Sequence, residues 1–344
     1  MKLLERLLTQ EFTQGYDNMD KLFEIKNLKT FFYTDAGTAK AVNNVSFDIY
    51  KGEVLGIVGE SGSGKSVTAK AIMQLNPGNT IYNEDAEIIM DGENVIKFTS
   101  KEDLKKIRGG KVSMIFQEPM ASFAPAIKIG DQMVEQLLLH KNIKKEEAKS
   151  ISLDMLTRVG ITDTEKRFNQ YAFELSGGMR QRAMIAMALS TMPKLLLADE
   201  PTTALDVTIQ AQVLKLMKDI IKEYKMGVIF ITHDLGVIAQ TADQIAVMYL
   251  GCVVERGSVN EILKNPKHPY TRGLIAALPD VNNLDAPLKP IPGNIPSPLE
   301  RPSNCVFRTR CPNPTHECKE GKTPMGLIEV SPGHWVDKCC VNCG

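Results

Sequence analysis

The stretch EVLGIVGESGSGKS, residues 53–66, decides the fold of this 344-residue chain. Its first half is an apolar run of the kind found in buried strands, and its second half is a glycine-rich loop. The loop matches the phosphate-binding pattern GxxxxGK(S/T) in full, and residues 65–75 return to helical spacing. Its members are Gly59, Glu60, Ser61, Gly62, Ser63, Gly64, Lys65 and Ser66. We therefore predict a strand, a loop that binds nucleotide phosphates and a helix in direct succession.

The chemistry of this loop gives each of its parts a task. The glycines let backbone N–H groups turn inward toward phosphate oxygens, and the start of the following helix adds partial positive charge. The Lys65 ammonium is expected to reach the β- and γ-phosphates, and the Ser66 hydroxyl is expected to bind Mg²⁺. The loop therefore predicts a nucleoside triphosphate and Mg²⁺ as its ligands.

A second apolar strand, predicted over residues 195–198, ends in the carboxylates Asp199 and Glu200. A carboxylate at a strand end suits Mg²⁺, so Asp199 is a predicted metal ligand. Glu200 is next to it and is predicted to polarise the water that attacks the γ-phosphate. Together with the loop, this pair predicts hydrolysis of the triphosphate.

The segment Leu175-Ser176-Gly177-Gly178-Met179 precedes an apolar helix predicted over residues 179–190. Ser176 and the two glycines lie at the start of that helix, where backbone N–H groups favour an anion. One chain has little use for two such elements on a single triphosphate. The pattern therefore predicts two chains that face each other head to tail, each capping the γ-phosphate held by the other.

Strands and helices alternate along the rest of the chain. Further strands are predicted over residues 22–32, 41–49 and 228–232, and further helices over 131–159 and 205–224. Such alternation predicts an α/β fold with a mostly parallel sheet. After about residue 265 the composition changes, and several prolines up to residue 302 indicate a linker or irregular structure.

The composition limits the class of protein. Apolar residues make up 43% of the chain and charged residues 24%, which indicates a packed core and excludes a disordered chain. Lys and Arg together number 41, as do Asp and Glu, so the formal net charge is zero and no nucleic-acid partner is expected. No run approaches the roughly 20 apolar residues that cross a bilayer, and a secretory signal is not expected.

The ordered motifs over about residues 22–265 resemble those of the ABC ATPase family. The resemblance implies ATP as the nucleotide and a P-loop cassette with a RecA-like core, an antiparallel β subdomain and a helical subdomain at about residues 118–174. It also implies how the chain is divided. The expected parts are an N-terminal extension over residues 1–18, an ABC ATPase domain over 19–265 and a small Cys-rich C-terminal domain over 266–344.

The same resemblance implies roles for further residues. Gln117 resembles the Q-loop glutamine, which senses Mg²⁺ and the γ-phosphate and couples to the transmembrane partner. Asp206 lies in a segment similar to the D-loop, which communicates between the two sites, and His233 resembles the switch histidine that contacts the γ-phosphate. Phe32 is the expected adenine-stacking residue, and Tyr33 is the alternative.

Within that family, residues 59–67 and 198–208 resemble the oligopeptide/dipeptide importer branch, in particular its D-type chain. Residues 268–272 (HPYTR) and 305–312 (CVFRTRCP) resemble the C-terminal extension of the same branch. This resemblance implies an ATPase subunit, peripheral at the cytoplasmic face of the cell membrane.

Its implied partners are a second, homologous ATPase chain, two transmembrane permease subunits and an extracytoplasmic solute-binding protein. A homodimer is the alternative to a pair of different ATPase chains. An importer of another solute, such as nickel, and a soluble ABC ATPase that acts on nucleic acid or ribosomes are the alternative functions.

Six of the seven cysteines lie between Cys305 and Cys343. In a reducing cytosol such a cluster favours a metal site over a disulfide framework. Four thiolates suit either a [4Fe–4S] cluster or Zn²⁺. Zinc is the weaker reading because the first three cysteines, spaced Cx5Cx6C, contain no CxxC pair.

The importer-branch resemblance implies the [4Fe–4S] cluster, with zinc and free or partly disulfide-bonded thiols as the alternatives. The predicted ligands are Cys305, Cys311, Cys318 and Cys339. For the fourth ligand, Cys340 and Cys343 remain alternatives to Cys339. A structural role is expected, because the tail is too short to build a core of its own.

Overall fold

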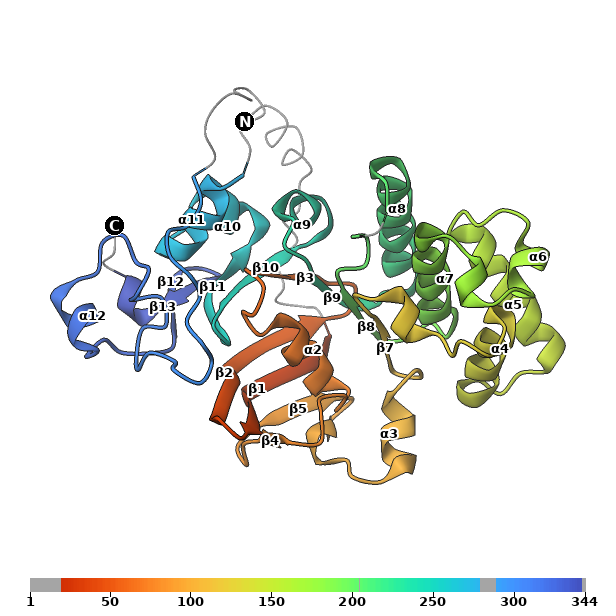
Figure 1. The fold of residues 1–344 in the computed structure, drawn as a ribbon, viewed down its shortest axis with the longest axis horizontal. Coiled ribbons are helices and arrows are strands. Elements are labelled where there is room, and N and C mark those ends of the chain that lie inside the picture. Colours follow the sequence, from red (N-terminus) through yellow and green to blue (C-terminus); the bar gives the residue numbers. More distant parts are fainter. Residues whose placement is uncertain (1–19, 204, 279–288, 342–344) are drawn as a thin grey trace. The chain divides into compact units, whose positions relative to one another are not determined.

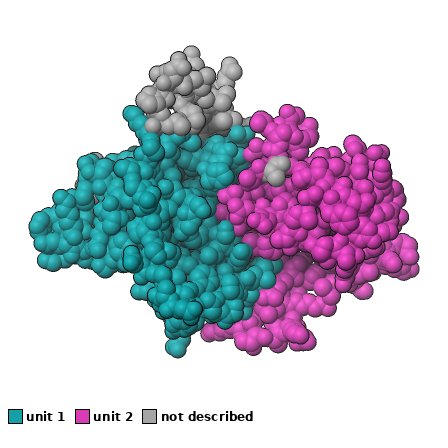
Figure 2. Space-filling view, viewed as in Figure 1, with its two compact units in different colours: residues 1–49, 54–96, 232–344 teal, residues 50–53, 97–231 magenta. Residues whose placement is uncertain are grey.

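The computed structural model describes residues 20–203, 205–278 and 289–341 of the chain. They fall into two compact units, which Figure 2 shows in different colours. Unit 1 is residues 1–49, 54–96 and 232–344, and unit 2 is residues 50–53 and 97–231. The predicted extension over residues 1–18 lies outside the described residues.

Unit 1 contains an antiparallel sheet built from β1 (Lys21–Thr34), β2 (Gly37–Tyr50), β4 (Thr80–Tyr82), β5 (Glu87–Met90) and β6 (Glu93–Asn94). The strand order is β2-β1-β5-β6, and β4 also pairs with β1. Apolar side chains alternate along β1, where Phe23 and Ile25 are each 1% exposed and point to the core. The two strands predicted in this part of the sequence are confirmed.

The second sheet of unit 1 carries the strand and helix around the phosphate-binding loop (Figure 1). Strand β3 (Val54–Val58) runs parallel to β10 (Gln244–Tyr249), which pairs antiparallel with β11 (Cys252–Ser258). Helix α2 (Lys65–Ile72) follows the loop after β3. The other helices before the C-terminal segment are α9 (Leu235–Thr241), α10 (Val259–Lys264) and α11 (Pro269–Ala276).

The C-terminal segment, residues 289–341, belongs to unit 1. It contains α12 (His316–Glu320), β12 (Leu327–Ser331), β13 (His334–Asp337) and the 3-10 turn η5 (Lys338–Cys340). Strand β13 pairs antiparallel with β11 and with β12, so the segment continues the sheet of the cassette. The expected small separate Cys-rich domain is therefore not confirmed, and the domain boundaries drawn from the sequence stay predictions.

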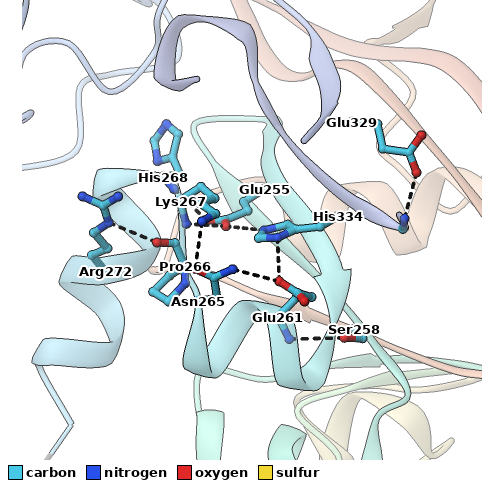
Figure 3. Close-up of polar contacts among 11 residues, drawn as sticks. Glu255, Ser258, Glu261, Asn265, Pro266, Lys267, His268, Arg272, Glu329 and His334 are labelled. Carbon is cyan, nitrogen blue, oxygen red and sulfur yellow. Dashed lines mark hydrogen bonds and ion pairs between the residues drawn. The ribbon is translucent and has the colours of Figure 1, made fainter. Parts of the chain in front are cut away.

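A buried polar network fastens β13 to the rest of unit 1 (Figure 3). Glu255 of β11 is 0% exposed, and its carboxylate accepts hydrogen bonds from the backbone N–H groups of Lys267 (2.7 Å) and His268 (2.9 Å). His334 of β13, also 0% exposed, lies between two carboxylates. Its Nε2 is 2.7 Å from Glu255 Oε1, and its Nδ1 is 3.0 Å from Glu261 Oε2.

Unit 2 is built on three parallel strands in the order β9-β8-β7, with bounds Gly227–Ile231, Leu195–Asp199 and Val112–Ile115. Every residue of these strands is buried, which explains why they read as apolar runs. The strands predicted over residues 195–198 and 228–232 are confirmed. Strand β7 was not predicted.

The helices of unit 2 are α3 (Lys101–Ile107), α4 (Ile129–His140), α5 (Lys145–Arg158), α6 (Thr164–Phe168), α7 (Gly177–Ser190) and α8 (Val207–Tyr224). Besides η5, the described residues form the short 3-10 turns η2 (Val95–Lys97), η3 (Pro119–Ser122) and η4 (Ala172–Glu174). Residues 131–159, predicted as one or two helices, form two, and α4 to α7 pack against one another (Figure 1).

Candidate functional site

The phosphate-binding loop, residues 59–66, lies between the end of β3 and the first turn of α2 in unit 1. Two of its positions need glycine. Gly59 has φ +154°, and a Cβ there would lie 2.2 Å from the carbonyl oxygen of Met248. Gly64 has φ +101°, and a Cβ there would lie 2.6 Å from the carbonyl oxygen of Ala41. Neighbouring backbone therefore fixes the path of the loop.

The Lys65 side chain is directed into the curve of this loop. The residue is 7% exposed, and its Nζ donates to the carbonyl oxygens of Gly59 (2.7 Å) and Glu60 (2.9 Å) and to Ser63 Oγ (3.2 Å). Ser66 is half-buried in the first turn of α2. The loop thus holds an ammonium group among acceptors that phosphate oxygens can replace.

Glu60, inside the loop, has partners that sequence reasoning missed. Its backbone N–H donates to Tyr270 Oη at 2.8 Å, and its carboxylate forms a two-point ion pair with Arg310. These partners are 210 and 250 positions away along the chain. Both residues occur in stretches that carry the importer-branch resemblance, but no spacing in the sequence connects them to Glu60.

Three further predicted residues lie in unit 1. His233 is exposed and directly precedes Asp234, whose carboxylate caps α9 by accepting from the N–H groups of Gly236 (2.7 Å) and Val237 (3.2 Å). Phe32 and Tyr33 are successive residues of β1, so they point to opposite faces. Phe32 is half-buried and Tyr33 is 59% exposed, and the choice between them stays a prediction.

The predicted hydrolytic residues lie in unit 2. Asp199 is 2% exposed at the end of β8, and Glu200 follows it in a left-handed conformation with φ +49°. Gln117 follows the neighbouring parallel strand β7, and its Nε2 is 3.5 Å from Glu200 Oε2. The structure therefore brings Gln117 and Glu200 together, although 3.5 Å is long for a hydrogen bond.

Thr203 is a further neighbour of Glu200 that the sequence did not reveal. Its Oγ1 donates to Glu200 Oε2 at 3.1 Å, and the Glu200 N–H donates to the carbonyl oxygen of Ile231 at 2.8 Å. The nearby sequence signal was the Thr-Thr pair at residues 202–203, which follows the carboxylates after Pro201. The threonine contact and the backbone bond both orient the carboxylate.

The predicted second anion-binding element lies at the start of α7. Ser176 is the N-cap of this helix and accepts from the Met179 N–H at 3.3 Å, and Ser176 and Gly177 are exposed. Gln181, one turn later, donates through Nε2 to the carbonyl oxygen of Pro201 at 2.6 Å. Helix α7 is therefore bonded to the residue that directly follows Glu200.

Asp206 lies at the start of α8, where its carboxylate caps the helix by accepting from the Ile209 N–H at 3.0 Å. Ala204, in the same predicted D-loop, lies outside the described residues. The structure thus gives Asp206 a local role in capping α8. Its role toward a second site stays a prediction.

The residues predicted for Mg²⁺ offer a hydroxyl, a carboxylate and an amide oxygen, which are the ligands that this ion prefers. Ser66 belongs to unit 1, and Asp199 and Gln117 belong to unit 2. The donor set fits Mg²⁺ in its chemistry. The position of the ion stays a prediction.

The cysteines of the C-terminal segment are partly in contact. Cys339 and Cys340 have their sulfur atoms 3.4 Å apart, and Thr315 Oγ1 donates to Cys318 Sγ at 3.1 Å. A hydrogen bond with Cys339, and after it burial, raises the pKa of Cys305 above its usual range. Metal binding would have to remove that proton.

Among residues 20–203, 205–278 and 289–341, no three His, Cys, Asp or Glu side chains are placed to hold a metal ion. The predicted [4Fe–4S] ligand set is therefore not supported by the arrangement of Cys305, Cys311, Cys318 and Cys339. The alternative ligand Cys343 lies outside the described residues. In the part of the chain that the structure describes, no helix is both long and apolar enough to cross a membrane.

Comparison with known proteins identifies two families along the chain. Residues 42–203, from before the phosphate-binding loop to beyond Glu200, match the family described as ABC transporter. Residues 254–318 match the family described as oligopeptide/dipeptide transporter, C-terminal region. The second match includes Tyr270 and Arg310, the two partners of Glu60.

Similar proteins cover nearly the whole chain. The oligopeptide transport ATP-binding protein OppD of Bacillus subtilis (strain 168) is 48% identical over 92% of this chain and 88% of its own length. The dipeptide transport ATP-binding protein DppD of the same organism is 46% identical over 94% of this chain and 95% of its own.

Among solved structures, an ATP-binding cassette described as a dimeric post-hydrolysis state bound to ADP and Pi superposes with a TM-score of 0.62 at 27% identity. The superposition covers 69% of this chain and 99% of the chain in the solved structure. The fold is therefore the P-loop ABC cassette, and the activity of its class is ATP hydrolysis. The chain belongs to the ABC transporter ATPases, in the group that carries the oligopeptide/dipeptide transporter C-terminal region.

Proposed function

We propose that this chain is the ATP-binding and ATP-hydrolysing subunit of an importer for oligopeptides or dipeptides. One observation carries this proposal: two relatives named for oligopeptide and dipeptide transport are 46–48% identical to it over more than nine tenths of its length. The chain also matches the oligopeptide/dipeptide transporter C-terminal region over residues 254–318.

The phosphate-binding loop would hold ATP through its backbone N–H groups and Lys65, and Phe32 or Tyr33 would stack on the adenine. Glu200 would act as the general base for the attacking water. Its Oε2 already accepts from Thr203 and lies beside Gln117, so two side chains orient it. His233 is exposed, as a residue that contacts the γ-phosphate must be.

Mg²⁺, held by Ser66, Asp199 and Gln117, would neutralise charge on the phosphates. Ser176 and Gly177 support a site completed by a second chain, because both residues are exposed at the start of a 14-residue helix. Asp206 would communicate between the two sites. A similar but non-identical ATPase chain is the proposed partner, with a homodimer as the alternative.

The remaining partners would be two transmembrane permease subunits and an extracytoplasmic solute-binding protein. The helices within residues 118–174 would contact the permeases at the cytoplasmic face of the membrane. Gln117 directly precedes this stretch, and its Nε2 lies 3.5 Å from Glu200 Oε2. A movement of the permeases would therefore reach the predicted base through Gln117.

Reconstitution tests the function. The chain, its partner ATPase and the permeases are placed in vesicles with the binding protein, and ATP hydrolysis and uptake of a labelled tripeptide are measured. We expect tripeptide to stimulate hydrolysis and to enter the vesicles, with Glu200→Gln as the inactive control. Stimulation by Ni²⁺ and not by peptide would assign another solute. Stimulation by DNA or RNA without permeases would assign a soluble ATPase.

We also propose, on the cysteine spacing and the branch resemblance, that the C-terminal segment carries a [4Fe–4S] cluster. Anaerobically purified protein should be brown and contain about four irons per chain, and Cys305→Ser should lose them. A colourless preparation with one zinc per chain would identify Zn²⁺ instead, and a metal-free one would leave free thiols.

A further inference from the structure

The phosphate-binding loop and the C-terminal segment are joined by an ion pair in unit 1 whose arginine is buried. The Arg310 side chain is 3% exposed, and its Nη1 and Nη2 donate to the two carboxylate oxygens of Glu60 at 2.8 and 3.2 Å. Arg310 also donates through Nε to the carbonyl oxygen of Pro292 (2.9 Å) and through Nη2 to that of Ile291 (3.1 Å). Four hydrogen bonds thus fix the guanidinium in one orientation.

Aromatic packing holds the turn that carries Arg310. Phe307, three residues earlier, is 1% exposed, and its ring centroid lies 5.2 Å from that of Tyr249 and 5.4 Å from that of Tyr270. The Arg310 guanidinium lies over the Tyr249 ring, 5.8 Å from its centroid. The packing of the C-terminal segment therefore sets the position of Arg310, which is not a flexible side chain on the surface.

Each polar group of Glu60 is engaged in this arrangement. Its N–H donates to Tyr270 Oη (2.8 Å), and its carbonyl oxygen accepts from the Ser63 N–H (3.2 Å) and from Lys65 Nζ (2.9 Å). Its carboxylate is committed to Arg310. The first turn of the loop is thus held by Tyr270 and Arg310 from outside the loop and by Ser63 and Lys65 from within it.

The charge of Glu60 gives this contact a consequence for ATP. A carboxylate inside a loop that receives a triphosphate repels it, unless a cation neutralises that carboxylate. Arg310 is the cation paired with the Glu60 carboxylate. Its side chain is 3% exposed and that of Glu60 is 31% exposed, so solvent screens the pair only in part. The same contact also keeps the loop in one conformation before the ligand arrives.

We propose that Arg310 is a positioning residue for ATP: it fixes Glu60 and cancels its charge, so that the C-terminal segment contributes directly to nucleotide affinity. This inference rests on the proposed function only in taking residues 59–66 as the ATP site. It assigns the C-terminal segment a task at that site whether or not its cysteines carry a metal.

Calorimetric titration with ATP and Mg²⁺ tests the inference on the full chain, in a Glu200→Gln background that prevents consumption of ATP. Arg310→Met should raise the Kd for ATP about tenfold, because it leaves an uncompensated carboxylate in the loop. The double variant Glu60→Gln with Arg310→Met should recover to within about threefold of the parent, because the repelling charge is gone. Arg308→Met, in the same turn, is the matched control and should leave the Kd unchanged.

Steady-state kinetics with Glu200 intact gives a second readout. Arg310→Met should raise KM for ATP and change kcat less than about threefold, because Arg310 does not touch the reacting atoms. Arg310→Lys keeps the charge but loses the two-point geometry, so its KM should be intermediate. This variant also serves if Arg310→Met fails to fold.

The outcomes separate this inference from the proposed function. An unchanged Kd and KM in Arg310→Met, even with a lowered melting temperature, would reduce Arg310 to a structural residue and overturn the inference. A double variant that binds ATP as weakly as Arg310→Met would also overturn it. A parent chain that binds no ATP would instead refute the assignment of residues 59–66.

Discussion

Glu60 in the phosphate-binding loop and Glu200 directly after β8 are carboxylates of the two predicted ATP-site segments, and their surroundings differ. Glu60 has a two-point ion pair with a buried arginine at 2.8 and 3.2 Å. Glu200 meets an exposed amide at 3.5 Å and a threonine hydroxyl at 3.1 Å. The carboxylate that only shapes the binding loop is held more firmly than the one predicted to react.

This difference follows from what each carboxylate must do. A binding loop gains affinity when its conformation is already fixed before the ligand arrives. A general base must change its partners when water and ATP arrive, so short and buried contacts would hinder it. The contrast teaches that the carboxylate of the binding loop is fixed by its partners, whereas the predicted base keeps longer and more exposed contacts.

The largest expected effect is on Glu200. Glu200→Gln keeps the shape of the side chain and removes the base, so turnover should fall about 10³-fold while ATP affinity stays within about twofold. Steady-state hydrolysis and calorimetric binding measure the two quantities. Glu223→Gln, an exposed residue of α8, is the control and should hydrolyse ATP normally. Wild-type turnover in Glu200→Gln would refute the role of Glu200 and remove the contrast.

The next effect concerns the network that holds β13 against β11. His334→Ala leaves the buried Glu255 with one partner fewer and opens a space, so the free energy of unfolding should fall by about 3 kcal/mol. Trp335, the sole tryptophan of the chain, follows His334 and reports urea unfolding by fluorescence. The control is His316→Ala, whose side chain is 83% exposed. Equal midpoints for both variants would contradict a stabilising network.

Acid should weaken unit 1 through His268. Burial, and then the charge of Arg272, lowers the pKa of His268 from 6.5 to about 3. Below about pH 6.5 the His268 imidazole therefore binds a proton in the unfolded chain but stays neutral in the folded chain. The free energy of unfolding falls as the pH drops from 6.5 toward 3. Between pH 7 and pH 5 this group should cost about 2 kcal/mol.

His268→Asn tests this pH dependence, because an asparagine can still cap α11 through the Tyr270 N–H, as His268 Nδ1 does at 3.1 Å. Glu255, which accepts from the His268 backbone N–H, is unchanged in the variant. Urea unfolding at pH 7 and pH 5 measures the difference. An equally steep loss in the variant would show that other groups cause it.

The smallest effect is expected at Gln117. Because its contact with Glu200 is exposed and long, Gln117→Ala should lower kcat by roughly three- to tenfold and leave the melting temperature unchanged. The decisive comparison is with Arg310→Met, which should change KM and not kcat. If Gln117→Ala raised KM and left kcat alone, the division between a binding carboxylate and a reacting one would be wrong.

Particular elements show how far sequence reasoning reached. Strands β3, β8 and β9 and helices α2, α7 and α8 were predicted, because apolar runs and glycine-rich loops are local signals. Strands β7, β10 and β11 were missed, although β10 is an apolar run that is buried from Ile245 to Tyr249. Strand β13 was missed because HWVD is four residues long and has no alternating pattern that a window could detect.

The sequence by itself determined the family and located the phosphate-binding loop, and it predicted Glu200 as the reacting carboxylate, since each motif behind these assignments is a short local stretch. Only the tertiary structure decided that Arg310, 250 positions away, neutralises Glu60, and that β13 continues the sheet beside β11. Within residues 289–341, the structure did not place three of the predicted cysteine ligands together as a metal site. The physical reason is that an ion pair, a strand pairing or a metal site joins residues that are far apart in the sequence. A local sequence pattern does not show which distant residues the fold brings together.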